Sequence, residues 1–138
     1  MDKQIINEKL ESLRRSSNRI EKKLPKTLAL FQEDLDAQDI IVLNLTRAVQ
    51  LCVDIGAHII SRSEESPPAT MGNTFDVLCE LNIIDSTLPT NLKISVGFRN
   101  IAVHGYTKLD FNVVYQIASQ QGVDFQAFAR EISGGSEH

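Results

Sequence analysis

The sequence predicts an all-α fold, an up-and-down bundle of five or six helices. Apolar residues recur at intervals of three and four over most of the chain, which is the spacing of one helix face. There is no Trp, and the 138 residues include only seven Gly and four Pro, which suits helices better than strands and turns. The length is that of one ordinary domain, so we expect a single domain over 1–138.

Two long helices are expected to open the bundle as an antiparallel hairpin. The first runs over about 2–24 and is ended by Pro25. The second runs over about 39–61, with a start that could lie as early as Phe31. Both carry an apolar stripe of alternating steps, which in the first comprises Ile6, Leu10, Leu13, Ser17, Ile20 and Leu24. Helices this long, joined by a modest connection, are expected to pack against each other.

A polar segment with two prolines predicts a loop over 61–73. A short helix over about 74–81 should follow, with Thr74 as its N-cap. The next helix should run from Leu88 or Pro89 to about 103.

The last expected helical region covers about 110–132, with an interruption at Gly122. The Gly- and Ser-rich segment 133–138 is expected to be a frayed tail, in which His138 plays no part.

Composition excludes several classes of protein. The fractions of hydrophobic residues (42%) and charged residues (23%) are those of a soluble globular domain. Cys52 and Cys79 are too few for a disulfide scaffold and are expected to be reduced core thiols. Neither a signal peptide nor an uninterrupted run of 18 apolar residues is found, so a cytoplasmic protein without a membrane span is expected.

Charge is unevenly distributed along the chain. Residues 1–26 hold eight basic and four acidic residues, a net charge of +4, while the remainder carries −8. The excess makes Arg14, Arg15 and Arg19 candidate RNA-binding residues. A solvated helix face is the alternative explanation of the same pattern.

The candidate chemistry lies in the run from Arg99 to Tyr106. Arg99 and Asn100 stand about one turn before His104, which is followed by Gly105. Gly105 is expected to end the helix in the left-handed conformation. In RNA cleavage without a metal, the imidazole of His104 could transfer protons while Arg99 meets charge on the phosphoryl oxygens. Spacing alone leaves open a capping His beside a surface Arg.

The run Gly97-Phe98-Arg99-Asn100-Ile101-Ala102-Val103-His104-Gly105-Tyr106 resembles the RX4HXY signature of HepT-like proteins. These are HEPN-domain toxins paired with a minimal nucleotidyltransferase antitoxin, MntA. The resemblance covers nearly the whole chain and includes Lys9-Leu10, Asn44-Leu45, Asp54-Ile55 and Leu109-Asp110.

The resemblance implies an HEPN fold and a metal-independent endoribonuclease that acts on tRNA or mRNA. Arg99 and His104 would be its catalytic pair, with Asn100 as the polar residue between them. It further implies a homodimer whose cleft combines two motifs, and inactivation when an MntA-type partner transfers AMP from ATP onto Tyr106. Two facing copies would also let two His104 residues divide the roles of acid and base. The alternative from another class is a non-catalytic HEPN module that binds a nucleotide or a protein.

Three other features are given structural roles. Asp54 and His58 lie four residues apart and could pair on one helix face. Tyr115 is expected to be an aromatic residue at the edge of the core. The His, Cys and carboxylate residues match no metal-binding pattern, so no metal or other cofactor is expected.

Overall fold

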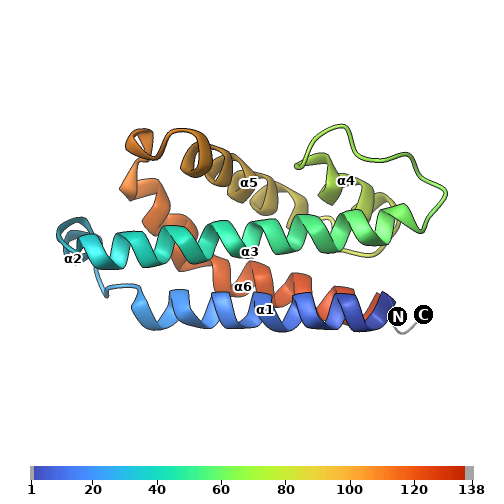
Figure 1. Cartoon of the computed structure of the whole chain (residues 1–138), viewed down its shortest axis with the longest axis horizontal. Coiled ribbons are helices and arrows are strands. Elements are labelled where there is room, and N and C mark those ends of the chain that lie inside the picture. The colour runs from blue at the N-terminus through green and yellow to red at the C-terminus, as the bar shows by residue number, and fades with distance from the viewer. Residues whose placement is uncertain (1, 136–138) are drawn as a thin grey trace.

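The computed structural model describes residues 2–135, and this part of the chain is helical without any strand. A short 3-10 turn, η1 (Tyr106–Lys108), separates the last two helices (Figure 1). The six α-helices are α1 (Asp2–Lys23), α2 (Leu28–Glu33), α3 (Leu35–Ser61), α4 (Asn73–Glu80), α5 (Leu88–His104) and α6 (Phe111–Gly135). The predicted all-α bundle is confirmed.

Helices α1 and α3 form the expected antiparallel hairpin (Figure 1). The predicted start of the second long helix was too late, because the chain first makes α2 as a separate turn of helix. Asp34 ends α2 and begins α3, where its side chain accepts a hydrogen bond of 3.0 Å from the backbone N–H of Ala37. The capping residue Asp34 therefore divides into two helices, α2 and α3, a segment whose apolar pattern alone is that of one continuous helix.

Helix α3 is the centre of the bundle and contacts all the other α-helices. By length and composition it is the one helix of residues 2–135 that is apolar enough to cross a membrane, which the sequence analysis did not expect. However, 56% of its most apolar window is buried inside the fold, as in the core helix of a globular domain. Its apolar residues pack with those of α1, α5 and α6 in a single core.

Two local predictions on α4 and α6 were wrong. Thr74 does not cap α4, because the helix begins at Asn73 and the Thr74 side chain is buried within it. Gly122 does not interrupt α6, which is continuous. Gly122 faces α1, where a Cβ would lie 2.5 Å from Oε1 of Glu21, the far end of a flexible side chain that can move aside.

The ends of the other predicted helices are close to those observed. Pro89 stands in the first turn of α5, where its missing N–H costs nothing. Helix α6 continues to Gly135, so the expected frayed segment is helical at 133–135. His138 lies outside the described residues.

Candidate active site

The last two turns of α5 bring Arg99, Asn100 and His104 to one end of the bundle. Arg99 is half-buried, and its Nη1 donates a hydrogen bond of 3.2 Å to Oδ1 of Asn100. The Nε–H of Arg99 is buried and has no acceptor within residues 2–135. A buried donor without a partner is costly, so this N–H keeps the capacity to donate to an acceptor that reaches the guanidinium.

His104 is the last residue of α5, and its side chain is exposed. It stands five residues after Arg99, so the two side chains are about 140° apart around the helix axis and one and a half turns apart along it. The imidazole of His104 is therefore exposed to solvent, nearer the end of α5 than the half-buried guanidinium of Arg99.

Gly105 ends α5 but not in the predicted way. Its φ of −160° and ψ of 61° are not left-handed, so the prediction was wrong on this point. Its N–H still donates to the carbonyl oxygen of Ile101 at 2.7 Å, and its own carbonyl accepts from Lys108 at 2.8 Å. These two bonds lead directly from α5 into η1 and fix the direction in which Tyr106 leaves the helix.

Tyr106 is 42% exposed, but its hydroxyl is engaged in a hydrogen bond. The Oη–H donates a hydrogen bond of 2.6 Å to Oδ1 of Asp39 near the start of α3. Partial burial of the phenol, followed by this bond and the negative charge of Asp39, raises the pKa of Tyr106 to about 12. Asp39 was missed by the sequence analysis because it lies 67 residues away and no motif includes it.

The outer face of α5 is apolar around the motif. Ile94 and Ile101 are 53% and 46% exposed and lie one above the other, and Asn100 and His104 share the exposed side of the helix with them. Val103, which is 50% exposed, lies on another side of α5, where it lines a hollow with Asp39 and Tyr106. An exposed apolar strip beside a reactive residue is typical of a surface that meets a partner.

Comparison with known proteins identifies the family. The family described as Ribonuclease HepT-like matches residues 6–132. The chain belongs to the HepT-like ribonuclease family. An mRNA nuclease HepT of Shewanella oneidensis is 34% identical over 124 residues, which cover 90% of this chain and 92% of the relative. A tRNA nuclease HepT of Aphanizomenon flos-aquae is 26% identical over 133 residues, covering 94% and 88% respectively.

A solved structure supports the same assignment. It is that of a tri-AMPylated HEPN toxin of Shewanella oneidensis in complex with its MNT antitoxin. The two folds superpose with a TM-score of 0.86 at 33% identity, over 94% of this chain and 97% of the other. The resemblance drawn from the RX4HXY run is confirmed.

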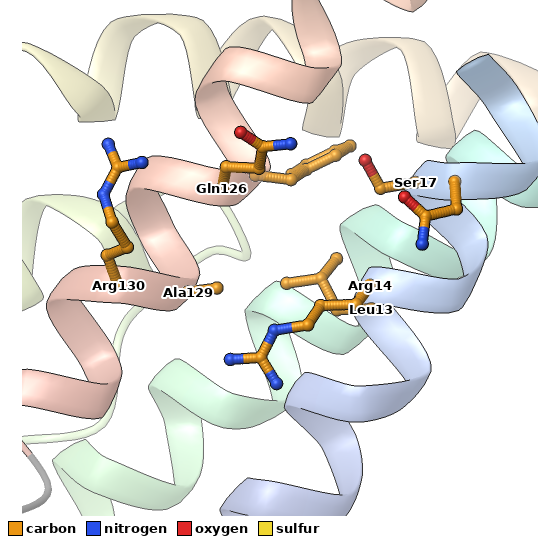
Figure 2. A pocket seen from close by; sticks show the side chains of 8 residues that line it. Leu13, Arg14, Ser17, Gln126, Ala129 and Arg130 are labelled. Carbon is orange, nitrogen blue, oxygen red and sulfur yellow. The ribbon is translucent and has the colours of Figure 1, made fainter.

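The basic residues of this HepT-like chain do not form one patch. Arg14 lines a hollow of about 340 Å³ between α1 and α6, where Arg130 stands on the opposite wall (Figure 2). Arg15 and Arg19 line a different groove, between α1 and α3. A helix turns by about 100° per residue, so neighbours in sequence face different partners.

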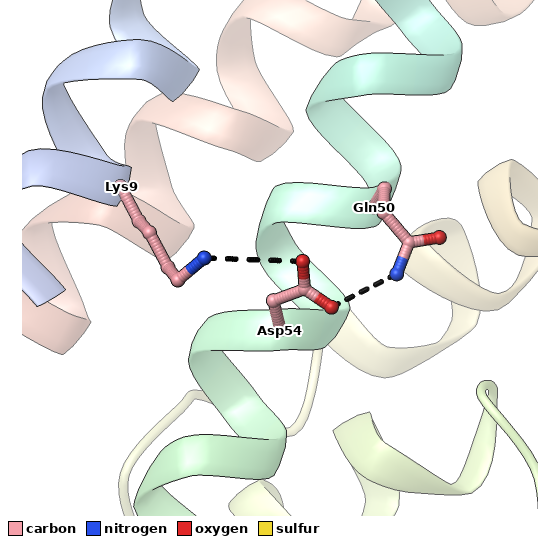
Figure 3. Close-up of polar contacts among 3 residues, drawn as sticks. All are labelled: Lys9, Gln50 and Asp54. Carbon is pink, nitrogen blue, oxygen red and sulfur yellow. Dashed lines mark hydrogen bonds and ion pairs between the residues drawn. The ribbon is translucent and has the colours of Figure 1, made fainter. Parts of the chain in front are cut away.

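The remaining candidates have structural contacts. Asp54 accepts a hydrogen bond of 2.9 Å from Nε2 of Gln50 and lies 4.0 Å from Nζ of Lys9 (Figure 3). Tyr115 is half-buried, as predicted, and its hydroxyl donates to the carbonyl oxygen of Pro25 at 2.8 Å. Among the described residues, no group of three His, Cys, Asp or Glu side chains could hold a metal ion.

Both cysteines are free, as expected. Cys52 is fully buried in α3, and burial raises the pKa of its thiol far above the usual range. It belongs to the core and not to the site.

Proposed function

We propose that this chain is the toxin of a toxin–antitoxin pair and acts as a metal-independent endoribonuclease in the cytoplasm. The observation that carries the proposal is the end of α5, where Arg99 is hydrogen-bonded to Asn100 and His104 is the last helical residue, in a chain of the HepT-like ribonuclease family. The Shewanella and Aphanizomenon relatives are named mRNA and tRNA nucleases, so the substrate class is RNA. Residues 1–138 are taken as one catalytic domain.

The proposed reaction is an internal transesterification. The ribose 2′-oxygen attacks the adjacent phosphorus and loses its proton to the neutral imidazole of one His104. The bond from phosphorus to the 5′-oxygen breaks, and that oxygen takes a proton from the protonated His104 of a second copy. The products are a 2′,3′-cyclic phosphate and a 5′-hydroxyl. Arg99 stabilises charge on the phosphoryl oxygens, and Asn100 orients its guanidinium through the hydrogen bond of 3.2 Å.

A homodimer is part of the proposal because one His104 cannot serve both steps at once. The exposed apolar strip of α5, made by Ile94 and Ile101, offers a surface that a second copy can cover. A two-fold contact along this strip brings two copies of the motif to one cleft.

The antitoxin is proposed to be an MntA-type nucleotidyltransferase that modifies Tyr106. The Shewanella toxin of the solved complex carries AMP groups and is bound to an MNT antitoxin. In the reaction, the oxygen of Tyr106 attacks the α-phosphorus of ATP, and pyrophosphate leaves as the bond to the bridging oxygen breaks. Asp39 is positioned to take the phenol proton. The added phosphodiester carries one negative charge, which would repel RNA and pair with Arg99.

The test uses purified protein and total RNA in excess EDTA. Cleavage should continue and leave 2′,3′-cyclic phosphate ends. Arg99→Ala should lower the rate by about 10²–10³ and His104→Ala by about 10²–10⁴, with unchanged circular dichroism. A strict requirement for Mg²⁺, or full activity of either variant, would contradict the proposal.

A further inference from the structure

A polar groove between α1 and α3 is separate from the motif and holds three arginines. It has a volume of about 500 Å³, within the range of roughly 300–1,000 Å³ typical of ligand sites. Arg15 and Arg19 come from α1, and Arg47 comes from α3. The groove also contains Ser12, Ser16, Asn44, Gln50, Leu51 and Asp54.

The three guanidiniums are exposed and little used by the fold. Arg15 donates only a long hydrogen bond of 3.5 Å to Oγ of Ser12. Within residues 2–135, no ion pair or hydrogen bond engages Arg19 or Arg47. Asp54 is the acidic residue of the groove, and Lys9 and Gln50 already contact it at one end (Figure 3). The groove therefore has an excess of positive charge.

Two amide oxygens in the groove also lack partners. Asn44 is only 2% exposed, and its Oδ1 is buried without a hydrogen-bond donor among the described residues, as is Oε1 of Gln50. The orientation of each amide is fixed, because Nδ2 of Asn44 donates to the carbonyl oxygen of Ile40 and Nε2 of Gln50 donates to Asp54. Both oxygens are shielded from solvent, and Oε1 of Gln50 points away from Lys9 (Figure 3), so the groove offers a ligand its exposed arginines and not these acceptors.

The groove and the motif lie on opposite sides of α3, because α1 packs on one side of this helix and α5 on the other (Figure 1). Tyr106 is bonded to Asp39, and α5 runs antiparallel to α3 (Figure 1). Arg99 precedes Tyr106 by seven residues, and Arg47 follows Asp39 by eight, so the two arginines lie at about the same level along the helix pair. Asp39, Leu43 and Arg47 form one exposed line on α3, about 12 Å long.

We propose that this groove binds the RNA substrate a few nucleotides from the bond that is cut. Arg15, Arg19 and Arg47 hold backbone phosphates. The proposal rests on the proposed ribonuclease function and names a second site for the same strand. An unpaired strand fits best, because its flexible backbone can follow the groove past all three arginines.

The test compares two double variants that each remove two positive charges. Arg19→Gln/Arg47→Gln alters the groove, while Arg14→Gln/Arg130→Gln alters the hollow between α1 and α6. Both are made with His104→Ala, so that RNA stays intact. Binding of a fluorescein-labelled single-stranded RNA of about twelve nucleotides is measured by anisotropy at several salt concentrations.

The groove variant should raise the Kd at least about tenfold at low salt, and should flatten the slope of log K against log salt by about 1.4, or 0.7 per lost phosphate contact. The control should change the Kd less than about threefold. Equal effects of the two variants, or an unchanged slope, would overturn the proposal.

Cleavage of RNA by the chain without substitutions is measured separately. If this chain cuts RNA but the groove variant binds RNA as tightly as the control, only the groove proposal is contradicted. If the groove variant loses binding but the chain without substitutions does not cut RNA, only the ribonuclease function is contradicted.

Discussion

The hydroxyl of Tyr106 donates a hydrogen bond of 2.6 Å to the carboxylate of Asp39 and thereby ties the exit of α5 to the start of α3. The phenyl ring also meets Phe111 of α6 edge-on, with centroids 6.4 Å apart. The residue that we propose as the modification site is therefore held by three elements. Its hydroxyl is neutral at physiological pH, and a proton acceptor is already in contact with it.

Replacing Asp39 with Asn should lower the pKa of Tyr106 from about 12 towards the ordinary value of 10.0. Part of the shift should remain, because partial burial of the phenol is its largest cause. Phenolate absorbance during an alkaline titration measures the pKa, in a Tyr115→Phe background so that one tyrosine titrates. An identical titration in the Asp39→Asn variant would show that the carboxylate does not act on the phenol.

The same shift has a consequence for stability. Because the pKa of Tyr106 is higher in the folded chain than in the unfolded chain, its contribution is complete below pH 10 and is lost as pH rises to about 12. Denaturant unfolding should therefore show a steeper loss of stability above pH 10 in the wild type than in Tyr106→Phe. Parallel curves would contradict the coupling.

Tyr106→Phe should remain toxic but resist the antitoxin. Its ring can still pack against Phe111, while the oxygen that would receive AMP is gone. Co-expression with the antitoxin and mass spectrometry measure growth and the added AMP, which in the wild type should appear on Tyr106. Asp39→Asn serves as a second variant, in which the oxygen remains and AMP transfer should slow by about 10² or more. If the antitoxin silences Tyr106→Phe as well as the wild type, blocking of the cleft explains neutralisation better than modification.

The sequence predicted the helices and the motif well, because periodicity and the RX4HXY run are local signals. It missed Asp39, which reaches Tyr106 only when α3 packs against α5, and Arg47, which meets Arg15 and Arg19 only when α3 packs against α1. It grouped Arg14 with Arg15, although the two diverge by about 100° around α1. It also assigned Gly105 a left-handed conformation, whereas the hydrogen bonds of η1 are made with φ at −160°. These errors share one cause. In each case the position or conformation of the residue is set by a segment that packs against it in the fold, and spacing along the sequence does not reveal that segment.

Ile94→Asp should abolish both dimerisation and RNA cleavage. The side chain is 53% exposed on the strip of α5 that we propose as the contact between copies, and a carboxylate there would be buried against its own symmetry mate. Light scattering gives the oligomeric state, and cleavage in EDTA gives the rate. The control is Val123→Asp on α6, where the valine is 65% exposed and away from the motif. A dimeric, active Ile94→Asp variant would place the interface elsewhere.

Gly56→Ala tests the packing of α3 against α4, which holds the long helix that carries Asp39 and Arg47. An added Cβ would lie 2.5 Å from Cγ2 of Thr74 and 3.0 Å from Cδ1 of Leu78, and both side chains are buried. Alanine favours a helix over glycine by about 1 kcal/mol, but overpacking typically costs about 1–3 kcal/mol, so a net loss of stability is expected.

A second substitution, at Thr74 of α4, removes the atom with which the new Cβ of Gly56→Ala would clash. Thr74→Ser deletes the Cγ2 methyl group that the new Cβ would meet, so Gly56→Ala/Thr74→Ser should be more stable than the sum of the two single changes predicts, by about 1 kcal/mol. Urea unfolding of all four chains gives this coupling. Additive effects, or a Gly56→Ala chain as stable as the wild type, would mean that α4 shifts to accept the methyl group and that the close approach is not required by the fold.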